Sequence, residues 1–285
     1  PSKSKTYLRH SSVESIRRVD AIIFDCDGVL LDIRDSYNKT VAVSTSYVLS
    51  ALTGLEYPEN FVSDEVISAF RKTGGFNNDW DLVYSIVAYT LCALPSAKRA
   101  RLGQLLQAAS GVADAYERFM TVAEKMQQET ERLSISGSDA KRLLLEFADN
   151  LDESGAISAD RALQSMLDAN GRAFHDRLSS FLHFGEPLQR NLIARVFEEL
   201  FCGPDRFRRS YRIEPKFHTS GLGYIENGRL IIQPQTLRSL AFIMGKSRFG
   251  VSSGSGADQA KYKLGNILEF FEPRAVIFRE TVEEA

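Results

Sequence analysis

A short apolar run that ends in two acids constrains the fold of this chain more than any other stretch. Residues Ala21 to Phe24 are apolar, and Asp25 and Asp27 follow with one residue between them. Such a run predicts a buried strand whose carboxyl end opens into a site. Residues two apart in an extended segment point the same way, so both carboxylates can face one point in space.

Two carboxylates held at one point repel each other unless a cation lies between them or one takes up a proton. Both arrangements suit phosphoryl transfer. Asp25 can be the nucleophile that forms an aspartyl-phosphate, and Asp27 the acid that protonates the leaving oxygen and later takes a proton from water. Mg²⁺ bound by Asp25 and Asp27 would offset the repulsion between carboxylate and phosphate. Gly28 allows the chain to turn sharply after the acids and to approach a substrate closely.

The stretch from Ala21 to Asp32 resembles the first motif of the haloacid dehalogenase (HAD) superfamily, an apolar strand followed by Asp-x-Asp-Gly-Val-x-x-Asp. The match extends over the whole motif, including Gly28 and Val29. The alternative is a surface strand that ends in a solvated acidic turn. The resemblance implies an α/β, Rossmann-like core and a magnesium-dependent phosphatase that acts on a small phosphorylated metabolite. It also implies that the backbone carbonyl of Asp27 contacts the metal.

Composition limits the remaining classes of protein. The chain has 285 residues, enough for two domains, and a formal net charge of −2, which gives no reason to expect nucleic-acid binding. No apolar stretch is long enough to span a bilayer, and no signal-peptide core follows the basic N-terminus. Cys26, Cys92 and Cys202 show no metal-ligand spacing. These features favour a cytoplasmic protein.

The order of predicted elements divides the chain into a tail, a discontinuous core and a helical insertion. Residues 1–18 are polar and basic and predict a mobile tail or a short exposed helix. Residues 19–36 and 222–285 predict the α/β core, and 37–221 a large all-helical cap inserted after the first strand. In HAD phosphatases such a cap is a mobile lid over the active site. Helices are predicted at about 36–52, 63–74, 80–94, 96–109, 112–132, 137–150, 158–169 and 187–201.

The second part of the core carries weaker signals. Asn227-Gly228 between apolar flanks predicts a two-residue hairpin turn. Residues Ala241 to Met244 predict a second buried strand, about 254–264 a helix, and Ala275 to Phe278 a third strand. The parallel sheet predicted in this way is incomplete at the C-terminus. We therefore expect the 285 residues to be a fragment of a longer protein.

The later motifs of the HAD superfamily match less well. Its second motif is a strand that ends in Ser or Thr, usually followed by Gly. The register that matches Gly245 puts Met244 in the place of the hydroxyl, and Ser247 and Lys246 can substitute from the loop. The alternative is that Met244 is a core residue and Lys246 is solvated. The lysine of motif three and the acids of motif four are absent after Phe278, so we expect little turnover by this chain.

A second signature lies between two predicted cap helices. Residues Arg71 to Trp80 contain Gly-Gly-Phe-Asn-Asn-Asp-Trp and resemble a loop in an uncharacterised branch of the HAD subfamily with a helical cap. Capped HAD phosphatases place specificity residues at such a loop. Arg71 and Lys72 can bind a substrate anion, and Asn77, Asn78 and Trp80 its leaving group. The alternative is that Asn78 or Asp79 caps the next helix and Trp80 packs inside the cap.

Three other functions remain open beside a phosphatase. A phosphomutase or another phosphotransferase would use the same aspartyl-phosphate chemistry with a different acceptor. A dehalogenase is disfavoured because dehalogenases lack the second acid, which is Asp27 here. A catalytically degenerate HAD-fold binding protein is favoured by Met244 and by the missing later motifs.

Overall fold

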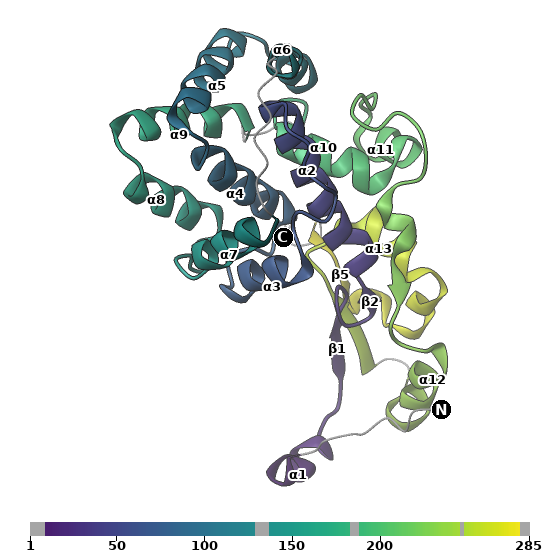
Figure 1. Cartoon of the computed structure of the whole chain (residues 1–285). Helices are drawn as coiled ribbons and strands as arrows, with labels where there is room; N and C mark the ends of the chain where they lie inside the picture. The colour runs from purple at the N-terminus through teal and green to yellow at the C-terminus, as the bar shows by residue number, and fades with distance from the viewer. Residues whose placement is uncertain (1–8, 129–136, 183–187, 246–247, 280–285) are drawn as a thin grey trace. The chain divides into compact units, whose positions relative to one another are not determined.

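The computed structural model describes residues 9–128, 137–182, 188–245 and 248–279 and divides the chain into two compact units. We call them the α/β unit, Pro1–Ile33 with Gly228–Ala285, and the helical unit, Arg34–Asn227. The helical unit is therefore inserted in the sequence between the two parts of the α/β unit (Figure 1). Both boundaries lie within a few residues of the predicted ones. Their identity as a HAD core and cap stays a prediction.

A parallel sheet of three strands forms the centre of the α/β unit, in the order β1–β4–β5. Strand β1 (Ile22–Asp25) pairs with β4 (Phe249–Ser252), and β4 pairs with β5 (Val276–Ile277). Segments from opposite ends of the sequence thus lie side by side (Figure 1). Asp25 is opposite Ser252 in this register, so the carboxyl ends of β1 and β4 reach the same edge of the sheet.

Strand β1 is buried on one face only, which differs from the fully buried strand that the sequence predicts. Ile23 is 74% exposed. On the other face, the ring of Phe24 packs against Phe249 and Phe271, with centroid distances of 6.3 and 5.8 Å. The alternation of buried and exposed positions is what an extended strand with one covered face produces.

Two short strands lie beside this sheet. Strand β2 (Leu31–Asp32) pairs in antiparallel fashion with β3 (Arg229–Leu230). The hairpin predicted at Asn227-Gly228 is therefore wrong. The residues before the turn form a 3-10 helix, Tyr224–Asn227, and the partner of β3 comes from the segment after the two acids.

The predicted second strand is also wrong, because Ala241 to Met244 are the last residues of helix α12 (Pro234–Met244). Proline at the first helical position favours a helix start, and Gly245 ends the helix with a φ of 92°. One face of α12 packs on the core of the unit, and its positions have the i, i+3, i+4, i+7 spacing of a helix. These core-facing residues are Leu237, Leu240, Ala241 and Met244.

The second strand of the sheet is β4, which lies between the predicted strand at 241–244 and the predicted helix at 254–264. A Cβ at Gly250 would lie 2.8 Å from the carbonyl oxygen of Ala275, so only glycine lets the chain pass at this distance. Helix α13 (Ala257–Leu264) follows β4 and ends at Gly265, where the sequence predicts its end. A 3-10 helix, Gly265–Phe270, leads toward β5.

Helices make up most of the helical unit (Figure 1). A π-helix at Arg34–Asn38 precedes the first of them. The helices are α2 (Lys39–Thr53), α3 (Asp64–Lys72), α4 (Asp79–Cys92), α5 (Ser96–Ala109), α6 (Ala115–Gln127), α7 (Gly137–Ala148), α8 (Ala156–Met166), α9 (Ala169–Leu182), α10 (Leu192–Cys202) and α11 (Pro204–Tyr211). Eight of these ten helices lie within a few residues of those that the sequence predicts, and α9 and α11 are helices that it does not predict.

Local capping signals explain why most of these helices are predictable. Gly54 ends α2 with a φ of 67°, and the Ser63 hydroxyl accepts a hydrogen bond from the backbone N–H of Val66 at the start of α3. In the other unit, the tail holds a 3-10 turn, His10–Ser12, and a short exposed helix α1, Val13–Ile16. None of the described helices combines the length and the apolar character that crossing a membrane requires.

A buried ion cluster lies inside the helical unit. The Arg195 side chain is 1% exposed and that of Glu199 is 0% exposed. Arg195 Nε donates to Glu199 Oε1 at 3.0 Å, and Arg195 Nη1 to Asp114 Oδ2 at 3.0 Å. The second Glu199 oxygen accepts hydrogen bonds from three successive backbone N–H groups, at Lys216, Phe217 and His218. The cluster therefore joins α10, the start of α6 and the segment that follows α11.

Candidate functional site

The candidate site lies at the carboxyl edge of the sheet in the α/β unit. Asp25 is the last residue of β1 and is exposed, and its Oδ1 accepts a hydrogen bond from the backbone N–H of Cys26 at 2.7 Å. Cys26, between the two acids, is fully buried and belongs to the core. Asp27 is half-buried. The two acids therefore flank a core residue and both reach the surface of the unit.

Asp27 is held by two donors from the second part of the unit. Ser255 Oγ donates to Asp27 Oδ2 at 2.6 Å, and Lys263 Nζ lies 3.1 Å from Asp27 Oδ1. The Lys263 side chain is 2% exposed, whereas that of Asp27 is 26% exposed. An ammonium buried to this degree needs a partner, and the Asp27 carboxylate provides it. The loop after β1, the loop after β4 and helix α13 meet in this way.

A tight turn fixes the backbone around Asp27. Gly28 has a φ of 80°, which favours glycine, and its N–H donates to the carbonyl oxygen of Leu31 at 2.8 Å. The N–H groups of Leu30 and Leu31 both donate to the Cys26 carbonyl oxygen, at 2.9 and 3.0 Å. The sharp turn predicted at Gly28 is confirmed. Direct binding of a substrate by Gly28 stays a prediction.

Two serine hydroxyls follow β4, the strand that pairs with β1. The sequence predicted Met244 for this position after the second strand. Ser253 is 8% exposed, its N–H donates to the Ile277 carbonyl oxygen at 3.0 Å, and its hydroxyl bonds to the Cys26 thiol. The Ser255 N–H in turn donates to Ser253 Oγ at 3.1 Å. The assignment of Met244 to the hydroxyl position is wrong, because that residue belongs to α12. The loop that reaches the acids is Ser253-Gly254-Ser255-Gly256.

Gly245, Lys246 and Ser247 are the other residues that the sequence predicts for the second HAD motif. The structure gives no test of their predicted contact with a substrate. Gly245 ends α12, and a Cβ there would meet no atom within 4 Å, so its positive φ explains the glycine. Lys246 and Ser247 lie outside the described residues. Their predicted contact with a substrate stays a prediction.

Three residues of the site, Ser253, Ser255 and Lys263, were not predicted from the sequence, and Lys263 is the charged one among them. The lysines expected at the site were Lys246, in the loop after the second predicted strand, and the lysine of motif three, which is absent after Phe278. The signal was a lysine that precedes Leu264 at the end of a short helix, one helical turn after Ala260 and beside the core positions of that helix. Its contact with Asp27 becomes visible only when the fold brings α13 to the loop after β1.

The thiol between the two acids is not a nucleophile. Burial, and next the Asp27 charge, raise the pKa of Cys26 to about 12. A thiol attacks as a thiolate, and at neutral pH this one stays protonated. Cys26 is therefore a packing residue, and the chemistry of the site rests on its oxygen and nitrogen groups.

A metal ion would find few side-chain ligands at this edge. The described residues include no group of three His, Cys, Asp or Glu side chains placed to bind one. Both Asp27 oxygens already accept hydrogen bonds from Ser255 and Lys263, whereas Asp25 Oδ2 accepts none from the described part of the chain. Mg²⁺ often uses one or two carboxylates and completes its shell with water and phosphate oxygens. The Asp25 carboxylate fits this mode, and the engaged carboxylate of Asp27 does not.

The second set of predicted substrate ligands belongs to the helical unit. The Arg71 guanidinium donates to Asn38 Oδ1 and to Asp79 Oδ1, both at 2.7 Å. It borders a pocket of about 440 Å³ that Lys72, an exposed residue, also lines. Arg71 therefore has an intramolecular role in joining α3 to α4. Binding of a substrate by Arg71 and Lys72 stays a prediction.

The Asn-Asn-Asp-Trp part of the loop starts a helix. Asn78 Oδ1 accepts a hydrogen bond from the backbone N–H of Trp80 at 2.9 Å, which confirms that Asn78 caps α4. Trp80 Nε1 donates to Glu198 Oε1 at 3.0 Å, so the indole is held inside the helical unit. Asn77 is exposed. The structural alternative thus accounts for Asn78 and Trp80, and contact of Asn77 with a leaving group stays a prediction.

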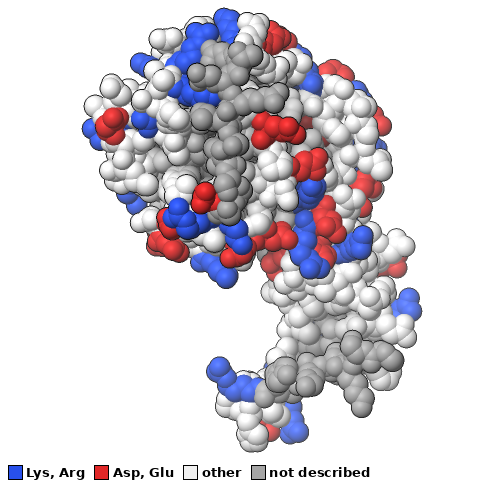
Figure 2. Space-filling model, in the orientation of Figure 1, with Lys and Arg blue, Asp and Glu red and all other residues white. Residues whose placement is uncertain are grey.

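Charges of both signs occur over the face of the molecule shown in Figure 2.

No protein-family model matches the chain, and no curated protein matches it. A solved structure, described as an X-ray structure of a Northeast Structural Genomics Consortium target, is similar with a TM-score of 0.65. The two chains are 17% identical, and the match covers 93% of this chain and 71% of that one. At this identity the likeness shows the fold alone, a mixed α/β chain that is mostly helical and carries a small parallel sheet.

Proposed function

We propose that the chain carries the acidic site of a HAD-type, magnesium-dependent phosphatase that hydrolyses a small phosphorylated metabolite through an aspartyl-phosphate. The observation that carries this proposal is the position of Asp25 at the end of β1, beside an Asp27 whose two oxygens are held by Ser255 and Lys263. An exposed carboxylate with one free oxygen is what an attack on phosphorus requires. The resemblance of residues 21–32 to the first HAD motif supports the same chemistry.

The proposed mechanism assigns one role to each of the two acids. An Asp25 oxygen bonds to phosphorus as the bond to the leaving oxygen breaks, and Asp27, which carries a proton in the substrate complex, gives that proton to the leaving oxygen. Water then attacks phosphorus and gives its proton to Asp27, which releases phosphate and restores the Asp25 carboxylate. Mg²⁺, bound by the Asp25 carboxylate and, as the resemblance implies, by the Asp27 carbonyl, would offset the negative charge of the phosphoryl group. Lys263 orients Asp27 and adds a buried positive charge.

The test is a phosphatase screen with Mg²⁺ over sugar phosphates and p-nitrophenyl phosphate, using the chain and the variants Asp25→Asn and Asp27→Asn. Any turnover should fall by on the order of 10³-fold or more in Asp25→Asn, because the proposed mechanism has no other nucleophile. Asp20→Asn is the matched control, since Asp20 is exposed and precedes β1. Turnover that survives in Asp25→Asn would remove the covalent mechanism.

A second candidate is a protein that binds phosphate esters without turning them over. It is favoured because the described residues place no third acid beside Asp25 to complete a metal site. Titration calorimetry with the same esters separates the two. Binding that is weakened by Asp25→Asn, without release of phosphate in any assay, selects the binding protein.

A further inference from the structure

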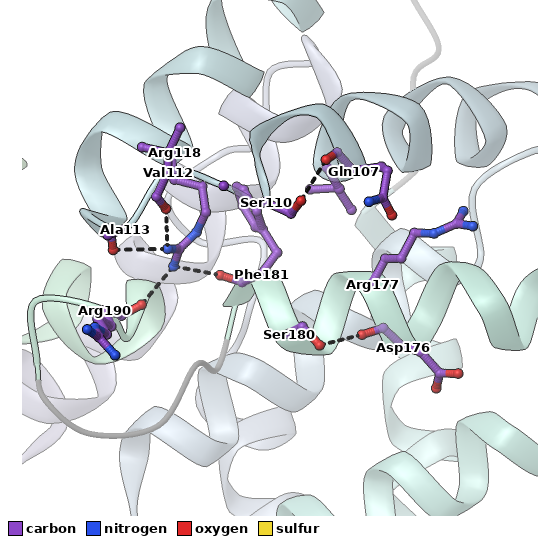
Figure 3. Close-up of a pocket in the computed structure, with 12 residues that line it drawn as sticks. Gln107, Ser110, Val112, Ala113, Arg118, Asp176, Arg177, Ser180, Phe181 and Arg190 are labelled. Carbon is purple, nitrogen blue, oxygen red and sulfur yellow. Dashed lines mark hydrogen bonds between the residues drawn. The ribbon is translucent and has the colours of Figure 1, made fainter.

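A pocket in the helical unit has the size of a small-molecule site. Its volume is about 560 Å³, and it lies between the end of α5, the turn before α6, the C-terminal half of α9 and the turn before α10 (Figure 3). Ligand sites in proteins are commonly about 300–1,000 Å³ and mostly apolar. Leu106, Val112 and Phe181 supply an apolar wall. The proposed phosphatase chemistry uses none of these residues.

A buried arginine holds the wall of this pocket together. Arg118 is 6% exposed, and its guanidinium donates to four backbone carbonyl oxygens (Figure 3). Nη1 bonds to Val112 and Ala113 at 3.1 and 3.3 Å, and Nη2 to Phe181 and Arg190 at 3.4 and 2.7 Å. Its Nε is buried without a hydrogen-bond partner in the described part of the chain. No carboxylate of the described residues forms an ion pair with it, so a positive charge is built into the wall.

The remaining charged residues of the pocket are also mainly basic. Arg177 and Arg190 are exposed, and Figure 3 shows them on opposite sides of Phe181. Asp176 is the acidic residue among those that line the pocket, and its Oδ1 accepts a hydrogen bond from Gln164 Nε2 at 2.7 Å. Three arginines against one aspartate leave the pocket basic in a chain whose net charge is −2. Basic groups beside an apolar wall select ligands that combine an anionic group with an apolar body.

We propose that this pocket binds a small amphiphilic anion, a carboxylate or phosphate joined to a short apolar chain or ring. The apolar body lies against Leu106, Val112 and Phe181, and the anionic group is bound by Arg177 or Arg190. Arg118 positions the wall through the carbonyl groups that it joins, and its charge favours an anion over a neutral ligand.

The test compares hexanoate, hexyl phosphate, hexanol and inorganic phosphate by titration calorimetry against the full chain. We expect hexanoate or hexyl phosphate to bind with a dissociation constant at least about tenfold below those of hexanol and inorganic phosphate. Only the amphiphilic anions can contact both the apolar wall and the arginines. The two anionic probes also distinguish a carboxylate ligand from a phosphate ligand.

Variants locate the binding. Arg177→Gln and Arg190→Gln, made singly and together, should weaken binding of the anion about tenfold or more in at least one case. Lys125→Gln is the control, because Lys125 is exposed on α6 and does not line the pocket. Gly111→Phe should fill the pocket and abolish binding. A Cβ at Gly111 meets no atom within 4 Å, so the variant should fold.

Equal binding of hexanol and hexanoate would overturn the proposal, since the arginines would then contribute nothing. Binding of the anions that persists in a folded Gly111→Phe variant would also overturn it, because the site would lie elsewhere. No binding of any probe by the wild-type chain would overturn it as well. Loss in Gly111→Phe and in an arginine variant, with binding retained in Lys125→Gln, supports it.

Discussion

The two units of this chain are stabilised in different ways. The helical unit encloses the fully buried pair Arg195 and Glu199, whose carboxylate also accepts three backbone hydrogen bonds. The α/β unit has a sheet of three strands, and large apolar side chains such as Ile23 and Phe242 are 74% and 91% exposed. An ion pair in this unit joins the buried Lys263 side chain to the acid Asp27. The helical unit uses buried charge to join its helices, whereas the buried charge of the α/β unit lies beside the acids of the candidate site.

The largest effect that follows from this comparison concerns Glu199. In Glu199→Ala, the buried Arg195 loses its main partner and three backbone N–H groups lose their acceptor, so unfolding should become easier by roughly 3–5 kcal/mol. Urea denaturation followed by circular dichroism measures the change. The control is Glu146→Ala, which removes an exposed ion pair with Arg142 and should change stability by less than about 1 kcal/mol. Equal losses in the two variants would show that the buried cluster does not stabilise the unit.

A second effect compares one glycine from each unit. In Gly250→Ala, the new Cβ would lie 2.8 Å from the Ala275 carbonyl oxygen, so β4 and the 3-10 turn before β5, Pro273–Ala275, must separate, at a cost of roughly 1–3 kcal/mol. In Gly111→Ala, the new methyl group enters open space in the helical unit and should be neutral or stabilising by up to about 1 kcal/mol. Calorimetric melting temperatures of the two variants measure the difference. A Gly250→Ala variant as stable as wild type would mean that the strands are not in such close contact.

The sequence predicts an element of the fold well when the residues that determine it are neighbours in the chain. Ser63, Asn78 and Gly54 act on residues within one helical turn, so the ends of α2, α3 and α4 can be derived from neighbouring residues. Strand β4 could not be predicted from its neighbours in the chain. Its glycine, Gly250, is required by a close contact with Ala275, which is distant in the sequence.

The candidate site likewise has a part that neighbouring residues determine and a part that distant residues determine. Asp25, Asp27 and Gly28 form one contiguous motif, and the strand, the acids and the turn lie where the sequence predicts them. Ser255 and Lys263 reach Asp27 from residues more than 200 positions away, through a loop and a helix whose placement depends on the whole sheet. A local pattern can show that an acid is present. Only the packed fold shows which donors hold it.

Alkaline pH offers a comparison between buried thiols of the two units. Burial raises the pKa of Cys26, in the α/β unit, and of Cys92, in the helical unit, to about 12 each. Each thiol stays protonated in the folded chain while its unfolded counterpart ionises above about pH 9. The contribution to stability is therefore complete below pH 9 and is lost as the pH rises toward 12, by about 1.4 kcal/mol per pH unit for each thiol.

Cys26→Ala and Cys92→Ala measure these contributions separately. The free energy of unfolding of each variant should fall less steeply than that of wild type between pH 8.5 and 10.5, since one ionising group is gone from the unfolded chain. Urea denaturation at a series of pH values gives the slopes. A variant slope equal to that of wild type would mean that the corresponding thiol is accessible to solvent in the folded chain.

The smallest expected effect tests the correction to the predicted strand. A buried strand at Ala241 to Met244 would not tolerate a polar residue at its centre, whereas in helix α12 the Ile243 side chain is 76% exposed. Ile243→Asn should therefore change stability by no more than about 0.5 kcal/mol. Leu237→Ala, on the buried face of the same helix, should lose roughly 2–5 kcal/mol. Urea denaturation of the two variants decides between the alternatives, because a strand would make Ile243→Asn the more damaging change and the helix makes it the milder one.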